Sequence, residues 1–191
     1  ESFIQSLLSC YVSIENDTTV YEKCYNLVPL KPSSFELLIK NKKFKVEVIE
    51  CYHSVPCLGY GFVEMRNKLK HEYTHLSGKE IGMLKKQGVD ICHEVEFPIF
   101  CFLGDTSKEI LNDKNLEKYQ TIMIECTFIS DDDIDQATKT CHMHWKDLKL
   151  YVISHPNITF ILYHFSRRYK KSDLEDFFKN ENLANVIPWV N

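Results

Sequence analysis

The hydrophobic positions of this chain fall into short runs that follow either the two-residue repeat of a strand or the spacing of a helix. Residues 3–12 carry apolar side chains at helical spacing. The polar turn Lys40-Asn41-Lys42 separates an apolar run at 35–39 from the alternating run at 44–48, which predicts a β-hairpin. The same pattern predicts further strands at 58–65, 97–103, 121–124 and 158–163.

Start and stop signals place the helices between these strands. Ser77 is followed three residues later by Glu80, a capping box that predicts a helix ending at Gly88. Further helices are expected over residues 131–139, 144–154 and 171–179. An early hairpin followed by strands that alternate with helices predicts a layered α/β fold. No low-complexity linker or internal repeat interrupts the pattern, so we expect residues 1–191 to form a single domain.

Composition and charge narrow the class of protein. The chain has 191 residues, of which 44% are hydrophobic and 26% charged, so it has enough apolar side chains for one core. No apolar run approaches the roughly 20 residues of a membrane helix, so no membrane partner is expected. The net charge is −4, so nucleic-acid binding would need a local basic patch. The eight cysteines include no CxxC pair, which favours reduced thiols over disulfides.

Four segments place side chains capable of metal binding or proton transfer at the ends of apolar strands. They cover residues 51–54, 103–106, 124–127 and 162–169. Each alone has an ordinary structural explanation: a strand-end histidine is usually structural, and Asp105 could cap a helix over 106–111. Together they would gather histidines and carboxylates at one edge of a sheet, where a layered fold exposes functional side chains.

Two of these segments resemble the late motifs of a known family. Gly104-Asp105-Thr106, followed by His164-Phe165-Ser166-Arg167-Arg168-Tyr169, is similar to the motifs of tRNase Z, whose final segment reads HFSxRY. The histidine that precedes Gly59-Tyr60, the segment Glu125-Cys126-Thr127, and His142, 22 residues before His164, resemble three further family segments. The resemblance runs from the first helix to nearly the last residue.

The resemblance implies a fold and an activity. The fold would be a metallo-β-lactamase αββα sandwich of the α/β class, with this chain as its C-terminal part. The stretch 67–91 is similar to the short eukaryotic form. The activity would be that of a zinc-dependent endoribonuclease that removes the 3′ trailer from precursor tRNA. Two alternatives stay open: another phosphodiesterase of this fold, or an inactive RNA-binding or dimerisation module.

The family's site residues carry over by position. His53 would ligate one zinc ion and His164 the other, and Asp105 would bridge both. The complete site would hold two Zn²⁺ ions, with Mn²⁺ or Mg²⁺ as substitutes. Glu125 and His142 would form a proton-delivery pair for the departing 3′ oxygen, so Glu125, His142 and Asp105 are the catalytic residues. Imidazole and carboxylate are suitable zinc ligands, and two such ions can activate water for phosphodiester hydrolysis.

The expected partners are precursor tRNA and a second copy of the chain in a homodimer. The expected compartment is the cytoplasm or nucleus, with the mitochondrion as an alternative. Arg168 would hold a phosphate or brace the site. The basic interval between His53 and Asp105 is either a charged helix face or a phosphate-binding patch that acts together with the cluster at 167–171. The candidate substrate contacts are Arg168, Ser166, Lys68 and Lys70.

The family's HxHxDH motif does not occur in this sequence. The segment His142-Met143-His144-Trp145-Lys146-Asp147 looks similar, but Lys146 occupies the aspartate position and Asp147 the final histidine position. His144 is therefore expected to be a surface or capping residue at a helix start. In the family the HxHxDH motif precedes the stretch that this chain resembles. With three ligands shared between two ions, the chain alone is expected to be inactive.

Overall fold

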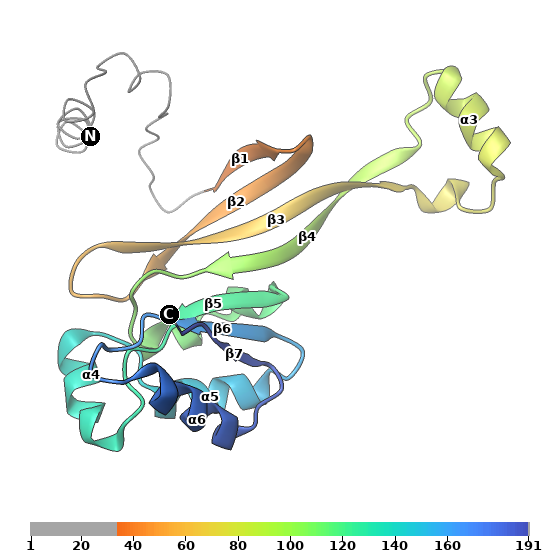
Figure 1. Ribbon diagram of the computed structural model, residues 1–191. Helices are drawn as coiled ribbons and strands as arrows, with labels where there is room; N and C mark the ends of the chain where they lie inside the picture. The colour runs from red at the N-terminus through yellow and green to blue at the C-terminus, as the bar shows by residue number, and fades with distance from the viewer. Residues whose placement is uncertain (1–33, 191) are drawn as a thin grey trace, which may run out of the picture. The chain divides into compact units, whose positions relative to one another are not determined.

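The computed structural model describes residues 34–190, and the helix predicted over residues 3–12 lies outside them. These residues form a seven-stranded sheet in the order β1 to β7 (Figure 1). The first four strands pair antiparallel: β1 (Ser34–Ile39), β2 (Lys42–Cys51), β3 (Cys57–Leu69) and β4 (Cys92–Phe102). The last three extend β4 in parallel: β5 (Thr121–Glu125), β6 (Thr159–Tyr163) and β7 (Val186–Pro188). Strand β7 was not predicted from the pattern.

The predicted hairpin is confirmed, and its turn has a clear backbone cause. Ile39 pairs with Lys42, so Lys40 and Asn41 form the loop, with φ of 48° and 64°. Positive φ at both loop residues gives the local twist that suits the strands of a two-residue hairpin. Strand β2 then pairs with β3 up to Cys51 and Cys57, so residues 52–56 form the loop that carries His53.

Strands β3 and β4 form a long hairpin whose far end lies away from β5. Their pairing runs from Tyr60 with Phe102 to Leu69 with Cys92. The connection holds the short 3-10 helix His71–Tyr73 and helix α3 (Gly78–Lys86). The predicted capping box is present, because Glu80 accepts from the Ser77 backbone N–H at 2.8 Å and Ser77 caps Glu80. Helix α3 has no buried residue, so local capping rather than core packing holds it.

Three helices form a layer beside the parallel strands: α4 (Ile134–Thr140), α5 (Trp145–Ser154) and α6 (Lys171–Glu181) (Figure 1). Their apolar side chains join those of the strands in one core, in which Leu148 and Phe160 are fully buried. Short 3-10 helices lie at Lys108–Asn112, Lys114–Lys118 and Asp131–Asp133. Of these, Lys108–Asn112 begins after Ser107, so Asp105 does not cap it. The helix-cap alternative for Asp105 is therefore wrong.

One close contact locks β3 against the segment before β5. A Cβ atom on Gly61 would lie 1.9 Å from the hydroxyl of Tyr119, so only glycine leaves room for that ring. The Tyr119 hydroxyl donates to Glu47 at 2.6 Å. Burial, with Glu47 beside it, raises the pKa of Tyr119 well above its usual value, so the phenol keeps its proton. The pair therefore fixes the antiparallel half of the sheet to the parallel half.

Two further expectations from the sequence concern membrane-spanning helices and the state of the cysteines. Among the helices of residues 34–190, none has the length and apolar character needed to cross a bilayer. The six cysteines of the same range are free. Cys10 and Cys24 lie outside the described residues.

Candidate metal and catalytic site

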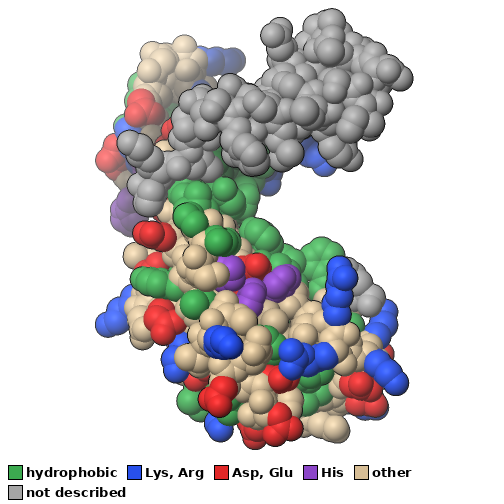
Figure 2. Space-filling view, turned by 90° about the vertical axis from the view of Figure 1, so that its left-hand side faces the viewer, with side chains coloured by type: hydrophobic (Ala, Val, Ile, Leu, Met, Phe, Trp, Pro, Cys, Tyr) green, Lys and Arg blue, Asp and Glu red, His purple; other side chains and the backbone are tan. Residues whose placement is uncertain are grey.

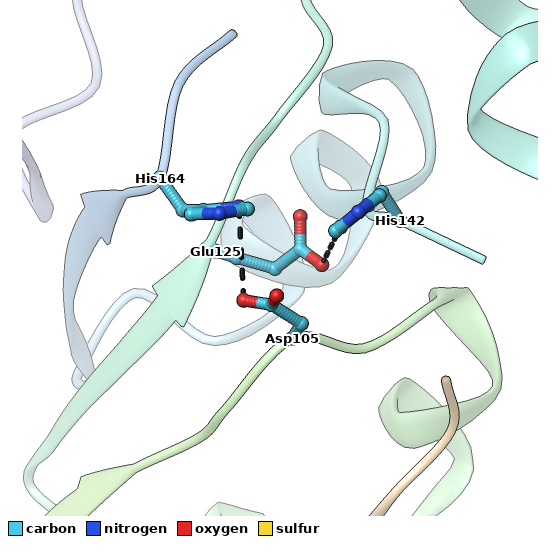
Figure 3. Close-up of side chains that lie close together, drawn as sticks. All are labelled: Asp105, Glu125, His142 and His164. Carbon is cyan, nitrogen blue, oxygen red and sulfur yellow. Dashed lines mark hydrogen bonds and ion pairs between the residues drawn. The ribbon is translucent and has the colours of Figure 1, made fainter. Parts of the chain in front are cut away.

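Four of the predicted site residues meet where the parallel strands end. Asp105 follows β4, Glu125 ends β5, His164 follows β6, and His142 follows α4. Parallel neighbours present their carboxyl ends at the same edge of a sheet, which is why residues far apart in sequence converge here. Each residue offers one ligand atom, and these four atoms all lie within 4.8 Å of one another (Figure 3). We call Asp105, Glu125, His142 and His164 the strand-end cluster.

The Glu125 carboxylate is the buried centre of this cluster. Its side chain is 0% exposed, and donors occupy both of its oxygens. Oε1 accepts from the Thr106 backbone N–H at 2.8 Å and from His142 Nδ1 at 2.7 Å. Oε2 accepts from the Thr127 hydroxyl at 2.5 Å and from the Met143 backbone N–H at 3.2 Å. A carboxylate with four donors is positioned to orient its neighbours and has little capacity left for a metal ion.

His142 is held by backbone conformation and by Glu125. The preceding Cys141 ends α4 in the left-handed region at φ 57°, which turns the chain so that the His142 N–H returns to Ala137 O at 3.0 Å. Because Nδ1 donates to Glu125, Nε2 is the nitrogen available to other groups. The ring centroid lies 4.9 Å from that of His53 and 5.3 Å from that of His164.

His164 adopts a conformation that non-glycine residues seldom take. Its φ is 62°, and such strain is found mainly where surrounding contacts demand it. Here the Thr127 hydroxyl lies 3.1 Å from Nδ1 and 3.2 Å from the His164 carbonyl. The Asp105 carboxylate lies 3.7 Å from the same Nδ1 atom (Figure 3). The bend after β6 therefore turns the imidazole towards the carboxylates.

The residues predicted as metal ligands present a donor set that zinc accepts. Asp105 and His164 lie together in the cluster, and both side chains remain partly exposed. His53 lies beside the cluster on the β2–β3 loop, where its ring contacts that of His142, but it is not one of the four residues whose ligand atoms lie within 4.8 Å of one another. Imidazole nitrogens and a carboxylate oxygen suit Zn²⁺. Cys126 does not fit as a ligand, because burial raises the pKa of its thiol well above the usual value and keeps it neutral.

The HFSxRY-like segment braces the site. The Arg168 guanidinium pairs with the buried Asp133, and its Nε donates to the Ser166 hydroxyl at 3.1 Å. The Tyr169 hydroxyl donates to Asp133 at 2.6 Å and accepts from the Ile129 backbone N–H at 3.1 Å. Of the two roles expected for Arg168, these contacts favour bracing. Ser166 is half-buried and donates its backbone N–H to Thr127 O at 3.0 Å.

Lys68 and Lys70 lie at the far end of the β3–β4 hairpin, away from the strand-end cluster. Lys70 Nζ pairs with Asp90 at 3.1 Å, and Lys68 Nζ lies 4.6 Å from the Phe97 ring centroid. Their part in substrate binding stays a prediction, since the structure does not bring them to the site.

His144 caps a helix, as predicted, but it is buried rather than exposed. Its side chain caps α5, where Nδ1 accepts from the Lys146 backbone N–H at 3.0 Å. Its Nε2 donates to Ser130 O at 2.9 Å, and the residue is 2% exposed. Both ring nitrogens are therefore engaged in structure, which leaves none for a metal ion.

Three residues of the site were not assigned a role from sequence. Thr127 links Glu125 to His164, Thr106 supplies a backbone donor to Glu125, and Asp133 anchors Arg168 and Tyr169. Thr127 and Thr106 lie within the segments 124–127 and 103–106, which the sequence had already indicated as candidate parts of the site. Asp133 is one of three consecutive aspartates at a helix start, and sequence alone does not show which one is buried.

The cluster opens to solvent beside a hollow of about 290 Å³ that His53 and His142 line together with Tyr52 and Lys108. Figure 2 shows histidine side chains grouped with an acidic one on a single face of the molecule. The arrangement thus combines an accessible set of metal-binding groups with an imidazole oriented by a buried carboxylate, which is suited to metal-assisted hydrolysis with acid–base catalysis.

No protein-family model matches the chain, but individual relatives do. It is 30% identical over 177 residues to tRNase Z TRZ1 of Arabidopsis thaliana. This aligned stretch covers 91% of this chain and 61% of that protein. It is also 30% identical over 144 residues to tRNase Z TRZ2, chloroplastic, of the same plant, covering 72% of this chain and 41% of that protein. The chain therefore spans about three fifths of the length of the first relative.

A solved structure shows the fold. The metallo-β-lactamase fold protein YhfI from Bacillus subtilis matches 90% of this chain and 56% of its own, with a TM-score of 0.51 and 14% sequence identity. The fold is thus that of the metallo-β-lactamases, as predicted. By sequence, over most of its length, this chain is a homologue of the tRNase Z proteins.

Proposed function

We propose that the strand-end cluster hydrolyses a phosphodiester bond in precursor tRNA and so removes the 3′ trailer. The observation that carries this proposal is the convergence of Asp105, Glu125, His142 and His164, whose ligand atoms lie within 4.8 Å of one another. The sequence relationship to proteins named tRNase Z supports tRNA as the substrate. The chain would act as the C-terminal part of a complete metallo-β-lactamase domain.

In this proposal Glu125 and His142 deliver the proton. The buried carboxylate accepts from Nδ1 at 2.7 Å and stabilises the imidazolium form, which leaves the Nε2 proton facing the substrate. Water attacks phosphorus, the bond from phosphorus to the 3′ oxygen breaks, and the Nε2 proton passes to that oxygen. The products are a 3′-hydroxyl on the tRNA and a 5′-phosphate on the trailer, and the attacking water loses one proton to solvent.

His53, Asp105 and His164 would hold the metal. Zinc ions bound there would lower the pKa of water and offset the negative charge of the phosphate. Thr127 fixes the orientation of His164 by its contact at 3.1 Å. Arg168 is paired with Asp133, so it supports the loop beneath the site rather than binding a phosphate.

The test is cleavage of a precursor tRNA by this chain joined to an upstream portion that carries the HxHxDH motif, because the chain alone is expected to be inactive; Zn²⁺ or Mn²⁺ is supplied. We expect one cut, just after the discriminator nucleotide, and a fall in kcat of at least about a hundredfold for His142→Ala. Asp105→Ala and His164→Ala should abolish cleavage. Asp135→Ala, an exposed carboxylate on α4, is the matched control and should cut normally. Unchanged cleavage by Asp105→Ala and His164→Ala would show that the metal assignment is wrong.

A further inference from the structure

A groove of about 530 Å³ begins at His164 and is distinct from the hollow beside His142. Its lining includes His164, Arg167, Lys171 and Trp189. The groove thus joins one histidine of the strand-end cluster to an aromatic ring and two basic side chains. We call it the Trp189 groove.

Trp189 is an exposed aromatic residue on a fixed backbone. It is 57% exposed, although its backbone N–H donates to Leu162 O at 2.8 Å immediately after β7. A large ring held at the border of a groove by its main chain offers a rigid face at low entropic cost. Such rings are the stacking platforms on which proteins place the bases of single-stranded nucleic acids.

The basic residues of the groove are unpaired, in contrast to their neighbour. Arg168 pairs with Asp133, whereas Arg167 and Lys171 make no ion pair among residues 34–190, and both are exposed. Arg167 carries a planar fork of donors and Lys171 a compact charge, and both groups bind phosphates. Figure 2 shows Lys and Arg side chains on the same face as the histidines. The groove therefore offers a base platform and phosphate ligands together.

The position of the groove relative to His142 sets the direction of a bound strand. His142 and His164 lie on opposite sides of the Glu125 carboxylate (Figure 3). In the proposed reaction His142 protonates the 3′ oxygen of the upstream nucleotide, which places that nucleotide at the hollow that His142 lines. The phosphate stays with the downstream nucleotide, which then continues past His164 into the Trp189 groove.

We propose that the Trp189 groove binds the first nucleotides of the trailer, the single-stranded RNA on the 3′ side of the cut. One base stacks on Trp189, and the backbone phosphates contact Arg167 and Lys171. This assignment rests on the proposed function, because the direction of the strand follows from the proton that His142 delivers.

The chain's two tryptophans give a direct measurement, since Trp145 is 3% exposed and Trp189 is 57% exposed. The probe is a 5′-phosphorylated oligouridylate of five nucleotides, added with EDTA so that no cleavage occurs. We expect it to quench the Trp189 fluorescence, and Trp189→Ala to weaken binding of a fluorescein-labelled form about tenfold. Trp189→Phe keeps a ring for stacking, so its loss of binding free energy should be less than half of the loss for Trp189→Ala. Leu150→Ala, an exposed apolar residue on α5, should bind normally.

The phosphate contacts have their own readout. Arg167→Gln and Lys171→Gln should each reduce the slope of log affinity against log salt by about 0.7, the value for one phosphate contact on a single strand. Lys179→Gln, on the same helix as Lys171 but outside the groove, should leave the slope unchanged. Binding without quenching, together with wild-type affinity for Trp189→Ala and Arg167→Gln, would overturn the proposal.

Cleavage separates failure of this inference from failure of the proposed function. Trp189→Ala should raise KM for a precursor tRNA with a long trailer and leave kcat unchanged. It should not affect a substrate whose trailer is a single abasic nucleotide, which has no base to stack on Trp189. An equal effect on both substrates would overturn the trailer assignment while precursor tRNA is still cut. Precursor tRNA left uncut by the wild-type chain joined to that upstream portion would instead refute the proposed function. The oligouridylate titration would still report on the groove, because it needs no cleavage.

Discussion

The strand-end cluster and the far end of the β3–β4 hairpin are held in place by opposite means. At the strand ends, Glu125 is 0% exposed and receives four hydrogen bonds from residues between 2 and 19 positions away. At the hairpin end, α3 has no buried residue and depends on Ser77 and Glu80, which are exposed. Buried hydrogen bonds are strengthened by low dielectric, whereas exposed caps compete with water.

This difference predicts which region of the molecule tolerates the loss of a hydrogen-bonding side chain. A buried polar network fails as a unit when one member is removed, because its other members lose their partners without access to water. A solvated cap loses only its own contribution, since water replaces the missing partner. Substitutions of the same chemical kind in the two regions should therefore have effects of different size.

The largest contrast is expected between the two glutamates. Glu125→Ala leaves the Thr106 and Met143 N–H groups and the His142 ring without their acceptor, so the free energy of unfolding should fall by about 3 kcal/mol or more. Glu80→Ala removes half of a capping box and should cost about 1 kcal/mol or less. Urea denaturation followed by circular dichroism measures both. Equal losses of unfolding free energy in the two variants would mean that the buried hydrogen bonds of Glu125 stabilise the protein no more than an exposed helix cap does.

A pair of glycines gives the next contrast. Gly61→Ala places a Cβ atom 1.9 Å from the Tyr119 hydroxyl, so the ring must move, and we expect a loss of about 1–3 kcal/mol. Gly82→Ala lies within α3, where the added Cβ meets nothing within 4 Å. It should stabilise α3 by about 0.5–1 kcal/mol, because alanine restricts the unfolded chain more than glycine does. Thermal unfolding measures the change in Tm for both variants. A change in the same direction for both would contradict this prediction.

Alkaline pH should act on stability through the Cys51 thiol at the end of β2. Burial raises the pKa of the Cys51 thiol to about 12, above the unfolded value of about 8.5. A folded pKa that is raised contributes stability in full below the unfolded value, and this contribution is lost as pH rises towards the folded one. The free energy of unfolding should therefore fall between pH 9 and 12, by up to about 1.4 kcal/mol per pH unit for this thiol. Cys51→Ala should show a shallower decline over the same range, and an identical decline would refute the assignment to Cys51.

Much of the fold was predictable because its signals are local. Neighbours within a few residues determine three of these features: the alternating run at 44–48, the turn at Lys40 and Asn41, and the capping box at Ser77. Strand β7 escaped prediction because it is three residues long and owes its existence to pairing with β6. The 3-10 helix after Asp105 was placed two residues too early, which wrongly left Asp105 as a candidate cap.

The site residues could be nominated from sequence, but their relationships could not. The resemblance of the strand-end segments to tRNase Z named Asp105, Glu125, His142 and His164, and the structure brings these four together. It could not show that Thr127 lies between Glu125 and His164, nor that Arg168 is committed to Asp133. Lys68 and Lys70 were nominated on charge alone, and charge does not specify where along a hairpin a residue lies.

The sequence by itself determined which side chains stand at the ends of strands, where the hairpin turns, and which box begins α3. These depend on backbone preferences and on hydrogen bonds that close within a few residues. The tertiary structure alone decided how closely Asp105, Glu125 and His164 approach one another, and that the Trp189 groove opens next to His164. The reason is that strand order and register bring together residues up to 59 positions apart, as Asp105 and His164 are, and no local pattern encodes that pairing.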